Sequence, residues 1–278
     1  MSDKPIKLFS PAKLNLFLHI LGKREDRYHE LQSFFQLLDY GDYLKFEKDL
    51  SGRLSLHLKE NSTVKTLPID RNLIISAAKK LRSYVGNPEL GARISINKRI
   101  PLGAGLGGGS SNAGITLRAL NKLWQCNLPN SDLALLGLNL GADVPVFVYG
   151  KSAWVEGIGE RIKPMHVEPS WYLVITPACL VSTAKIFAHE NLTRNSPAIK
   201  MADFLAGRAR NDCEEVTRNL YPEVDEALNW LSQFGGARMT GTGSAVFRRF
   251  ETETAAREVF ASVPSNLEGF IAKGIDSL

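Results

Sequence analysis

The stretch PLGAGLGGGSS, residues 101–111, places five glycines in eleven residues between two regular patterns. Before it, Ala92–Ile100 alternates apolar and polar residues, which predicts a half-buried strand. After it, Asn112–Trp124 carries apolar residues at helical spacing, which predicts a helix. Glycines let the backbone adopt positive φ angles and approach a ligand without an intervening Cβ atom. This order predicts a binding site for a phosphate chain at a helix N-terminus, with Ser110 or Ser111 as the helix cap.

The glycine stretch differs from the best-known phosphate loops. It contains G-x-G-x-x-G at Gly103, Gly105 and Gly108, which is a weak pattern alone. A dinucleotide-binding unit needs a second strand soon after the helix, whereas Leu133–Leu140 has a helical pattern and we expect extended structure only from Val144. A Walker loop needs a lysine after its last glycine, and a protein-kinase glycine loop lies between two strands. A flexible turn without a ligand is the alternative, and the flanking strand and helix disfavour it.

The composition is that of an ordinary globular protein. Of 278 residues, 44% are hydrophobic and 23% are charged, and this length suits two domains better than one. The net charge of +5 comes from scattered Lys and Arg, which suit a polyanionic small substrate and form no aromatic-basic array typical of nucleic-acid interfaces. Three cysteines without paired spacing, Cys126, Cys179 and Cys213, indicate a reducing compartment and argue against a zinc site.

Neither a secretory signal nor a membrane span is expected from the apolar segments. The first residues lack the apolar core of a signal peptide. The longest apolar stretch, residues 133–148, is interrupted by Asn139, Asp143 and Pro145. We therefore expect a cytoplasmic protein.

Two places in the first part of the chain carry candidate site residues. Alternation in Ile6–Ile20 predicts a strand with Lys13 and Asn15 on one face, where they form either an ordinary charged surface or an inward polar site. Tyr28 and His29 end a polar loop. They are either packed on the sheet or part of a site.

Two further candidates lie next to predicted helices. An amphipathic helix is expected over residues 72–85, with Asn72 near its N-terminus. Asp143 precedes Val144 and Pro145, and the proline predicts an extended conformation for Val144. Such an acid either organises a turn or is a carboxylate held at the end of an apolar wall.

The character of the chain changes near residue 160, which predicts domains over residues 1–160 and 161–278. In the second part, residues 237–250 predict a strand, a Thr-Gly-Thr-Gly-Ser turn and a second strand. This turn is either an ordinary hairpin or a second backbone cradle that faces the first. Strands are also expected over residues 171–176 and 269–273, and helices over residues 211–219, with Asp212 as a candidate cap, 225–233 and 253–260.

Taken together, these motifs resemble the GHMP kinases, the superfamily of galactokinase, homoserine kinase and mevalonate kinase. The resemblance covers essentially the whole chain: residues 101–111 resemble the phosphate loop, SPAKLNLFL (10–18) the first motif and RMTGTGSAVF (238–247) the third. SPAKLNLFL, YHELQSFFQ (28–36), LDYGD (38–42) and LGADVPVF (140–147), in this order, are closest to one group of these kinases. That group transfers the γ-phosphoryl group of ATP to the 2-hydroxyl of a cytidine-diphosphate-linked methylerythritol in the non-mevalonate isoprenoid pathway.

The resemblance implies an α+β fold in two domains, with both substrates in the cleft between them. The N-terminal domain would resemble domain 2 of ribosomal protein S5, and the C-terminal domain would be a ferredoxin-like α/β sandwich. A left-handed β-α-β crossover is also implied, where general chirality rules expect a right-handed one.

The resemblance also assigns site residues by position. Asp143 would accept the proton of the attacking hydroxyl, and Lys13 would keep Asp143 ionised and support the developing negative charge. ATP would bind with Mg²⁺, for which no residue pattern singles out protein ligands beyond a serine of the loop. The implied nucleotide-binding residues are Pro101, Leu102, Gly103, Ala104, Gly105, Leu106, Gly107, Gly108, Gly109, Ser110, Ser111, Asn72 and Lys98. Tyr28 and Phe187 would stack on the cytosine ring, and the implied substrate-binding residues are Asn15, Tyr28, His29, Thr183, Phe187 and Thr240.

The sequence departs from the family pattern at two positions. Arg27 stands where glycine is expected before Tyr28, and Ala104 stands where glycine is common. Three alternatives remain beside this interpretation: another enzyme of the same scaffold, such as a mevalonate-type kinase or diphosphomevalonate decarboxylase, a basic RNA-binding module, and a nucleotide sensor without turnover. As partners we expect a small-molecule substrate, no nucleic acid and no membrane, in a monomer or weak homodimer.

Overall fold

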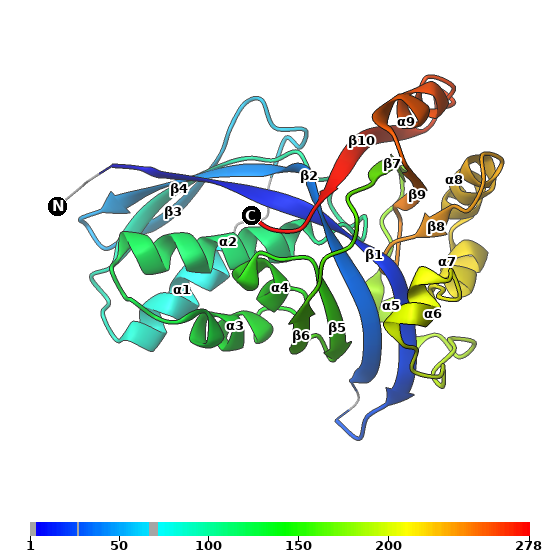
Figure 1. Cartoon of the computed structure of the whole chain (residues 1–278). Helices are drawn as coiled ribbons and strands as arrows, with labels where there is room; N and C mark the ends of the chain where they lie inside the picture. Colours follow the sequence, from blue (N-terminus) through cyan, green and yellow to red (C-terminus); the bar gives the residue numbers. More distant parts are fainter. Residues whose placement is uncertain (1–3, 27, 67–71) are drawn as a thin grey trace.

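The computed structural model describes residues 4–26, 28–66 and 72–278 (Figure 1). Arg27, one of the two departures noted above, lies outside the described residues. No helix of the described chain is long and apolar enough to cross a membrane. In chain order the elements are β1 (Ile6–Lys23), β2 (His29–Asp49), β3 (Leu54–Leu58), α1 (Leu73–Val85), β4 (Gly91–Asn97), α2 (Gly108–Leu123), α3 (Asn130–Leu138), α4 (Val144–Tyr149), β5 (Ala153–Gly157), β6 (Arg161–Pro164), β7 (Trp171–Thr176), α5 (Thr183–Ala188), α6 (Met201–Leu205), α7 (Glu214–Leu220), α8 (Pro222–Ser232), β8 (Arg238–Met239), β9 (Val246–Phe250), α9 (Glu253–Phe260) and β10 (Glu268–Ile275).

Two long antiparallel strands, β1 and β2, run through both halves of the molecule (Figure 1). Their pairing shifts register between Pro11 and Lys13 and again between Asn15 and Phe17. Such bulges bend a strand and redirect its side chains, and they are common beside active sites. The two irregularities flank the segment that carries Lys13 and Asn15.

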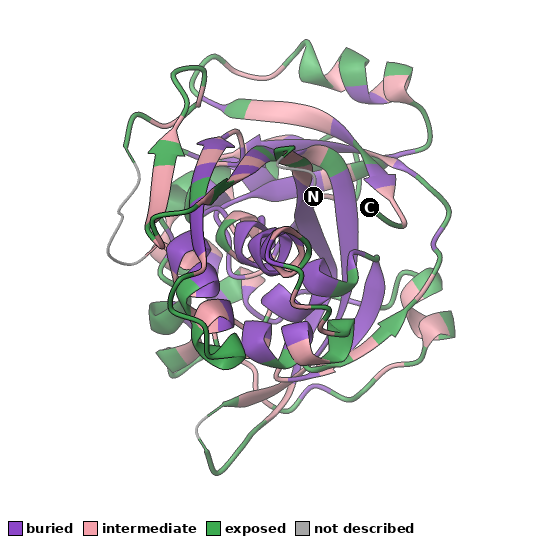
Figure 2. Ribbon diagram, turned by 90° about the vertical axis from the view of Figure 1, so that its left-hand side faces the viewer, coloured by how far each residue is buried: buried purple, intermediate pink, exposed green. Residues whose placement is uncertain are grey.

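In the first half of the chain, helices cover one face of the sheet. Strands β3 and β4 pair in parallel with α1 between them, and β4 pairs antiparallel with β2. This β-α-β unit is the place where the left-handed crossover is expected, and its handedness stays a prediction. Apolar side chains of β2 and β4, such as Phe46 and Ile94, pack with Leu81 of α1 and Leu117 of α2 in one core cluster. The helix faces turned toward the sheet are buried in Figure 2.

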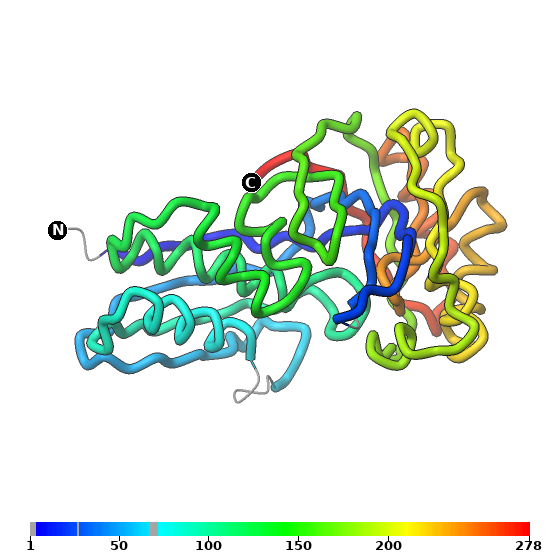
Figure 3. The backbone as a smooth tube through the Cα atoms, turned by 90° about the horizontal axis from the view of Figure 1, so that it is seen from below, coloured from blue at the N-terminus to red at the C-terminus, as the bar shows by residue number. Residues whose placement is uncertain are grey.

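In the second half, β7, β8, β9 and β10 form the continuation of the sheet. Strand β10 pairs antiparallel with β7 and, at its end, with Leu37 and Leu38 of β2, so the strand order is β3-β4-β2-β10-β7-β9-β8. Figure 3 shows this last strand returning from the second half toward the first. The expected boundary near residue 160 falls inside the β5–β6 hairpin, which pairs with β2. The boundary itself stays a prediction.

Most elements expected in the sequence form where they were placed, and three local predictions are wrong. The cap of α2 is Gly107 and neither Ser110 nor Ser111, because the helix already begins at Gly108. Helix α7 has Cys213 as its N-cap, whereas the carboxylate of Asp212 accepts a hydrogen bond from the backbone N–H of Ile20 at 2.7 Å.

The third correction concerns the segment after Asp143. Residues Val144–Tyr149 form α4, and Val144 is helical where extended backbone was expected. Pro145 lies in the first turn of this helix, where a backbone N–H has no intrahelical partner and proline is tolerated.

Candidate active site

The glycine loop lies between β4 and α2, as the sequence predicts. Gly103, Gly105 and Gly107 have φ angles of 67°, 73° and 69°, in the left-handed region that favours glycine. A Cβ atom on Gly105 would lie 2.5 Å from the carbonyl oxygen of Thr240, and one on Gly107 would lie 2.9 Å from Cγ of Lys13. No described side chain caps the N-terminus of α2. Its first N–H groups therefore have no side-chain acceptor, and such groups are available to an anion.

The other residues of the loop hold it in place. Ala104 and Leu106 are buried beneath it, with 3% and 1% exposure, while Leu102 is exposed. The carbonyl oxygen of Ala104 accepts a hydrogen bond from the backbone N–H of Ala245 at 3.1 Å. The hydroxyls of Ser111 and Ser10 are 2.7 Å apart, so Ser111 anchors α2 to β1. Alanine at position 104 therefore fits a packed site in this chain.

Lys13 and Asp143 lie side by side next to the loop. Nζ of Lys13 is 3.5 Å from a carboxylate oxygen of Asp143; the lysine side chain is 4% exposed and the aspartate 31%. The same ammonium group donates a hydrogen bond to the side-chain oxygen of Asn15 and lies 4.9 Å from the ring centroid of Phe35. The backbone N–H of Lys13 donates to the carbonyl oxygen of Leu106 at 3.0 Å, which joins β1 to the glycine loop.

The position of Asp143 follows from how α4 packs. Asp143 is the N-cap of this helix, with φ −82° and ψ −17°. A Cβ atom on Gly114 of α2 would lie 2.8 Å from Cβ of Phe147, so this glycine lets the two helices approach closely. The packing directs the N-terminal end of α4, and its aspartate, toward the lysine of β1.

The Thr-Gly-Thr-Gly-Ser turn, residues 240–244, faces the glycine loop. Oγ1 of Thr240 accepts a hydrogen bond from the backbone N–H of Asn15 at 2.8 Å. The hydroxyls of Thr242 and Thr183 are 3.0 Å apart. The turn thus contacts both β1 and α5. Because the turn lies against the glycine loop, its position fits the second interpretation left open by the sequence, a backbone segment that faces the loop. Its contact with a ligand stays a prediction.

These elements enclose a cavity of about 300 Å³, called here the active-site cavity. Its lining is apolar toward β2 and β5 and polar toward the glycine loop, which is typical of small-molecule sites. The residues that line it are Lys13, Asn15, Leu18, Leu31, Ser33, Phe35, Gly105, Gly107, Ala142, Asp143, Val155, Ile158, Gly159, Thr183, Phe187, Gly241 and Thr242.

The aromatic residues expected on the substrate side are only partly brought together. The rings of His29 and Phe187 have centroids 5.1 Å apart and an interplanar angle of 37°. Tyr28 is 60% exposed and does not line the cavity. The pKa of His29 lies below its ordinary value because the ring is partly buried and because Arg194 and Lys23 are nearby. The imidazole is therefore neutral at pH 7.

Arg194 is a residue of this region that sequence reasoning missed. Its Nε donates a hydrogen bond to Nε2 of His29 at 3.3 Å, and its Nη2 donates to the carbonyl oxygens of Phe187 at 3.1 Å and His189 at 2.7 Å. Because Nε2 of His29 accepts, the ring proton is assigned to Nδ1. Arg194 belongs to an irregular loop, and neither periodicity nor a motif marks it in the sequence.

Lys98 and Asn72, the two residues assigned to the adenosine end, have structural partners. Asn72 caps α1 by accepting a hydrogen bond from the backbone N–H of Ile74 at 2.9 Å. Nζ of Lys98 lies 2.7 Å from a carboxylate oxygen of Asp42, and both side chains are buried. Neither residue lines the active-site cavity. Their contact with a nucleotide stays a prediction.

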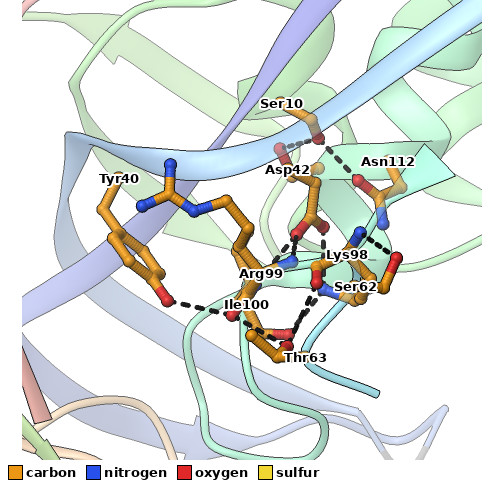
Figure 4. A network of polar contacts seen from close by, with 10 residues as sticks. Ser10, Tyr40, Asp42, Ser62, Thr63, Lys98, Arg99, Ile100 and Asn112 are labelled. Carbon is orange, nitrogen blue, oxygen red and sulfur yellow. Dashed lines mark hydrogen bonds and ion pairs between the residues drawn. The ribbon is translucent and has the colours of Figure 1, made fainter. Parts of the chain in front are cut away.

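Asp42 is the centre of a buried polar network around the residues that follow β4 (Figure 4). Beyond the ion pair with Lys98, its carboxylate accepts hydrogen bonds from the backbone N–H groups of Arg99 at 2.7 Å and Ile100 at 2.8 Å. Lys98 also donates to the carbonyl oxygen of Ile100 at 2.7 Å. This network fixes the chain where it leaves β4. Asp42 is the last residue of the LDYGD motif, and this motif was the feature of the sequence that could have drawn attention to the network.

Comparison with known proteins defines the class. Family models match twice, the GHMP kinases N terminal domain over residues 72–151 and the GHMP kinases C terminal domain over residues 190–269. A Marinobacter nauticus protein is 53% identical over 98% of this chain and 94% of its own length, and a Pseudomonas aeruginosa protein is 50% identical over 97% and 94%. The chain belongs to the GHMP kinase family, which confirms the resemblance and the two-domain α+β fold of that family. As a member, it is an ATP-dependent kinase that acts on a small molecule.

Within this family, the two relatives of 50% identity or more carry one name. Both bacterial relatives are named 4-diphosphocytidyl-2-C-methyl-D-erythritol kinase. A solved structure described as 4-(cytidine 5'-diphospho)-2C-methyl-D-erythritol kinase is 32% identical, covers 97% of this chain and 99% of its own, and has a TM-score of 0.81.

Proposed function

We propose that this protein transfers the γ-phosphoryl group of ATP to the 2-hydroxyl of 4-(cytidine 5'-diphospho)-2-C-methyl-D-erythritol, in the non-mevalonate isoprenoid pathway. The observation that carries the proposal is the Lys13–Asp143 pair, 3.5 Å apart, beside a loop of exposed backbone. The names of the relatives, which match over nearly the full chain, support the choice of substrate.

In this mechanism the loop between β4 and α2 binds the triphosphate of ATP. Gly103, Gly105 and Gly107 carry no side chains, so the backbone of the loop can come close to the phosphates. The N-terminus of α2 supplies backbone N–H donors and the positive end of the helix dipole. Phosphoryl transfer has a loose transition state, so most of the rate comes from positioning and charge neutralisation.

Asp143 and Lys13 act on the acceptor. Asp143 takes the proton of the 2-hydroxyl as that oxygen forms its bond to the γ-phosphorus and the bond to the β,γ-bridging oxygen of ATP breaks, which releases ADP. Lys13 stabilises the negative charge on the transferring group, and its contacts with Asn15 and the ring of Phe35 hold its ammonium in place.

We propose that Mg²⁺ enters with the nucleotide. The described residues contain no group of three or more His, Cys, Asp or Glu side chains that could hold a metal ion alone. This fits Mg²⁺, which is usually bound by one or two protein groups together with substrate phosphates. Ser110, in the first turn of α2, has no protein hydrogen bond among the described contacts and is the candidate ligand, whereas the hydroxyl of Ser111 already bonds Ser10. When bound, the ion neutralises charge on the β- and γ-phosphates.

The substrate is selected by its cytosine ring. Phe187 lines the active-site cavity and would stack on the base, while His29 beside it would read a base edge with the Nδ1 proton. Tyr28 would close on the other face of the ring from its exposed position. Asn15 and Thr183, which line the active-site cavity, would bind the substrate beside His29, and Thr240 would act next to them through its hydrogen bond with the backbone N–H of Asn15.

The remaining expectations belong to the same proposal. The protein acts in the cytoplasm on a small molecule, as a monomer or weak homodimer, without nucleic-acid or membrane partners. The scattered positive charge supports this, because it suits polyanionic small substrates.

The test is ADP production from ATP and Mg²⁺ with three acceptors: the cytidine-diphosphate-linked methylerythritol, free methylerythritol and mevalonate. We expect turnover with the first alone, and a product that carries phosphate on the 2-hydroxyl. Turnover with mevalonate would contradict the proposed substrate and indicate a mevalonate-type kinase.

A further inference from the structure

A second cavity lies on the other side of β1 from the active-site cavity. On β1, Asn15 lines the active-site cavity and Leu16 lines the second one. The second cavity has a volume of about 250 Å³ and shares no lining residue with the first; it is lined by Leu16, Val167, Tyr172, Phe204, Leu205, Gly207, Gly236, Arg238, Phe247 and Arg249.

The walls of this cavity are apolar. Leu16, Val167 and Phe247 belong to one buried core cluster, and Phe204 of α6 packs against it. Leu205, next to Phe204, is 66% exposed despite its large apolar side chain. Apolar walls with a few directed polar groups are the usual character of a small-molecule site.

The Tyr172 hydroxyl is the first polar group of the cavity. Tyr172 is 1% exposed, yet none of the described residues forms a hydrogen bond with its hydroxyl. The hydroxyl is not among the fully buried side-chain atoms that lack a partner, so it is reachable from the cavity, where a ligand can form a hydrogen bond with it. Burial raises the pKa of Tyr172 to about 12, so the group is protonated at pH 7 and can donate.

The other two polar groups are the guanidinium groups of Arg238 and Arg249; the Glu214 carboxylate acts on Arg238 electrostatically but lines a different cavity. Arg238 donates to the carbonyl oxygen of Leu16 at 3.0 Å, and Nε of Arg249 donates to Oγ of Ser170 at 2.7 Å. Across the described part of the chain, neither guanidinium forms an ion pair. Each guanidinium has five N–H donors, so most of them are available to a ligand.

We propose that this cavity is a second binding site, which takes a small amphipathic anion with a short apolar body and a phosphate or carboxylate head. The apolar walls bind the body, and the head accepts hydrogen bonds from Tyr172, Arg238 and Arg249. All three polar groups are donors, which selects an acceptor with negative charge.

The site is linked to the active site through β1 and β8. Arg238 contacts Leu16, which follows Asn15 on β1. Two residues after Arg238, Thr240 accepts the hydrogen bond of the Asn15 backbone N–H. A ligand that moves Arg238 therefore acts on β1, which carries Asn15 of the active-site cavity, and on the turn at residues 240–244, which contacts the glycine loop. The affinity for nucleotide should then change when the second cavity is filled.

Binding is tested with n-hexyl phosphate as the probe, by calorimetry on protein saturated with ADP so that the glycine loop is occupied. We expect n-hexyl phosphate to bind, with n-hexanol and inorganic phosphate each at least about tenfold weaker. Tyr172→Phe, which loses no protein hydrogen bond and should fold normally, and Arg249→Gln should each weaken the probe by about tenfold. Arg248→Gln is the matched control, because Arg248 neighbours Arg249 on β9 and does not line the cavity.

Two outcomes would overturn the site. One is no heat of binding on the ADP-saturated protein. The other is binding that Tyr172→Phe and Arg249→Gln leave unchanged, which would place the probe elsewhere. The link is tested by ADP affinity with and without saturating probe. It should change in the wild type, and Arg249→Gln should need about tenfold more probe for the same change, whereas competition at the glycine loop would need the same probe concentration in both proteins.

Discussion

Nζ of Lys13 lies 3.5 Å from a carboxylate oxygen of Asp143, although one residue comes from β1 and the other from the N-terminal end of α4. The pair is asymmetric, with the lysine buried and the aspartate partly open to the active-site cavity. The open member can reach a substrate hydroxyl, and the buried member holds a fixed positive charge beside it.

Replacement of Asp143 by Asn should therefore reduce turnover far more than nucleotide binding. A positioned general base contributes about 10²–10⁴-fold to rate, so we expect kcat to fall within that range. The KM for ATP should stay near its wild-type value, because the glycine loop binds the phosphates. Steady-state kinetics measures both constants, with Asp132→Asn as the control because Asp132 lies in the first turn of α3 and outside the active-site cavity. Turnover near the wild-type rate would remove Asp143 from the mechanism.

Phe187→Ala should raise the KM for the cytidine-diphosphate-linked substrate and leave the KM for ATP nearly unchanged. Stacking of a base on an aromatic ring contributes about 1–3 kcal/mol, which corresponds to roughly 5–150-fold in affinity. Phe260→Ala on α9 is a suitable control, because Phe260 is an exposed phenylalanine that lies outside the cavity. Equal changes in both KM values would refute the role of Phe187.

Arg194 should act through His29 and is expected to be a positioning residue. Arg194→Met removes a nearby positive charge, so the pKa of His29 should rise toward 6.5, as measured by NMR titration. In Arg194→Met, the KM for the cytidine-linked substrate should rise with little change in kcat. In Arg194→Lys, the pKa of His29 should be close to its wild-type value while the KM stays raised, because lysine keeps the positive charge and lacks the planar set of donors of arginine. An unchanged pKa in Arg194→Met would exclude this coupling.

The same shift has a consequence for stability against pH. The folded pKa of His29 lies below its ordinary value of 6.5, chiefly because of burial. As the pH falls below 6.5, His29 is protonated in the unfolded chain before it is protonated in the folded protein. The free energy of unfolding therefore decreases with falling pH until the folded pKa of His29 is reached. His29→Gln should lose this part of the pH dependence in chemical denaturation at a series of pH values. An identical profile in the variant would show that His29 does not contribute.

The Lys98–Asp42 pair should contribute to folding. Lys98→Met leaves a buried carboxylate without its cation, and breaking a buried pair costs about 3–5 kcal/mol of unfolding free energy. Burial lowers the pKa of Lys98, and Asp42 opposes this shift. Lys45→Met, which breaks the partly exposed pair with Glu47, should change stability by about 1 kcal/mol or less. Unchanged stability with a raised KM for ATP would instead place Lys98 at the nucleotide.

How far the sequence predicts this molecule depends on how local each feature is. The strand, glycine loop and helix around residues 101–111 follow from short-range patterns, and α9 forms at Glu253–Phe260 as its periodicity predicts. The helical state of Val144 does not follow from a short-range pattern. The residue before a proline usually prefers extended backbone, and here tertiary packing overrides that preference.

The site divides in the same way. Lys13 and Asp143 were found through motifs, whereas Arg194 was not, because its hydrogen bonds join an irregular loop to His29 far away in the chain. The cap of α2 was misplaced since Ser110 and Ser111 are favourable caps by type, but the glycines before them already adopt the helical and left-handed angles. Contacts between distant segments are visible only in the folded molecule.

Gly105 should tolerate no side chain, both because its φ angle is positive and because a Cβ atom would meet the turn at residues 240–244. Gly86 has a similar φ angle without such a contact, so it separates the two effects. Gly105 and Gly86 have φ angles of 73° and 72°, so alanine incurs a similar backbone strain of about 1 kcal/mol at either position. A Cβ atom on Gly86 meets nothing within 4 Å, whereas one on Gly105 would lie 2.5 Å from the carbonyl oxygen of Thr240. Gly105→Ala should therefore be more destabilised than Gly86→Ala in chemical denaturation and should lose affinity for ADP by calorimetry, because the loop must move away from the turn at residues 240–244. Equal loss of stability in both variants, with unchanged ADP affinity, would show that the close contact of these two glycine segments does not shape the nucleotide site.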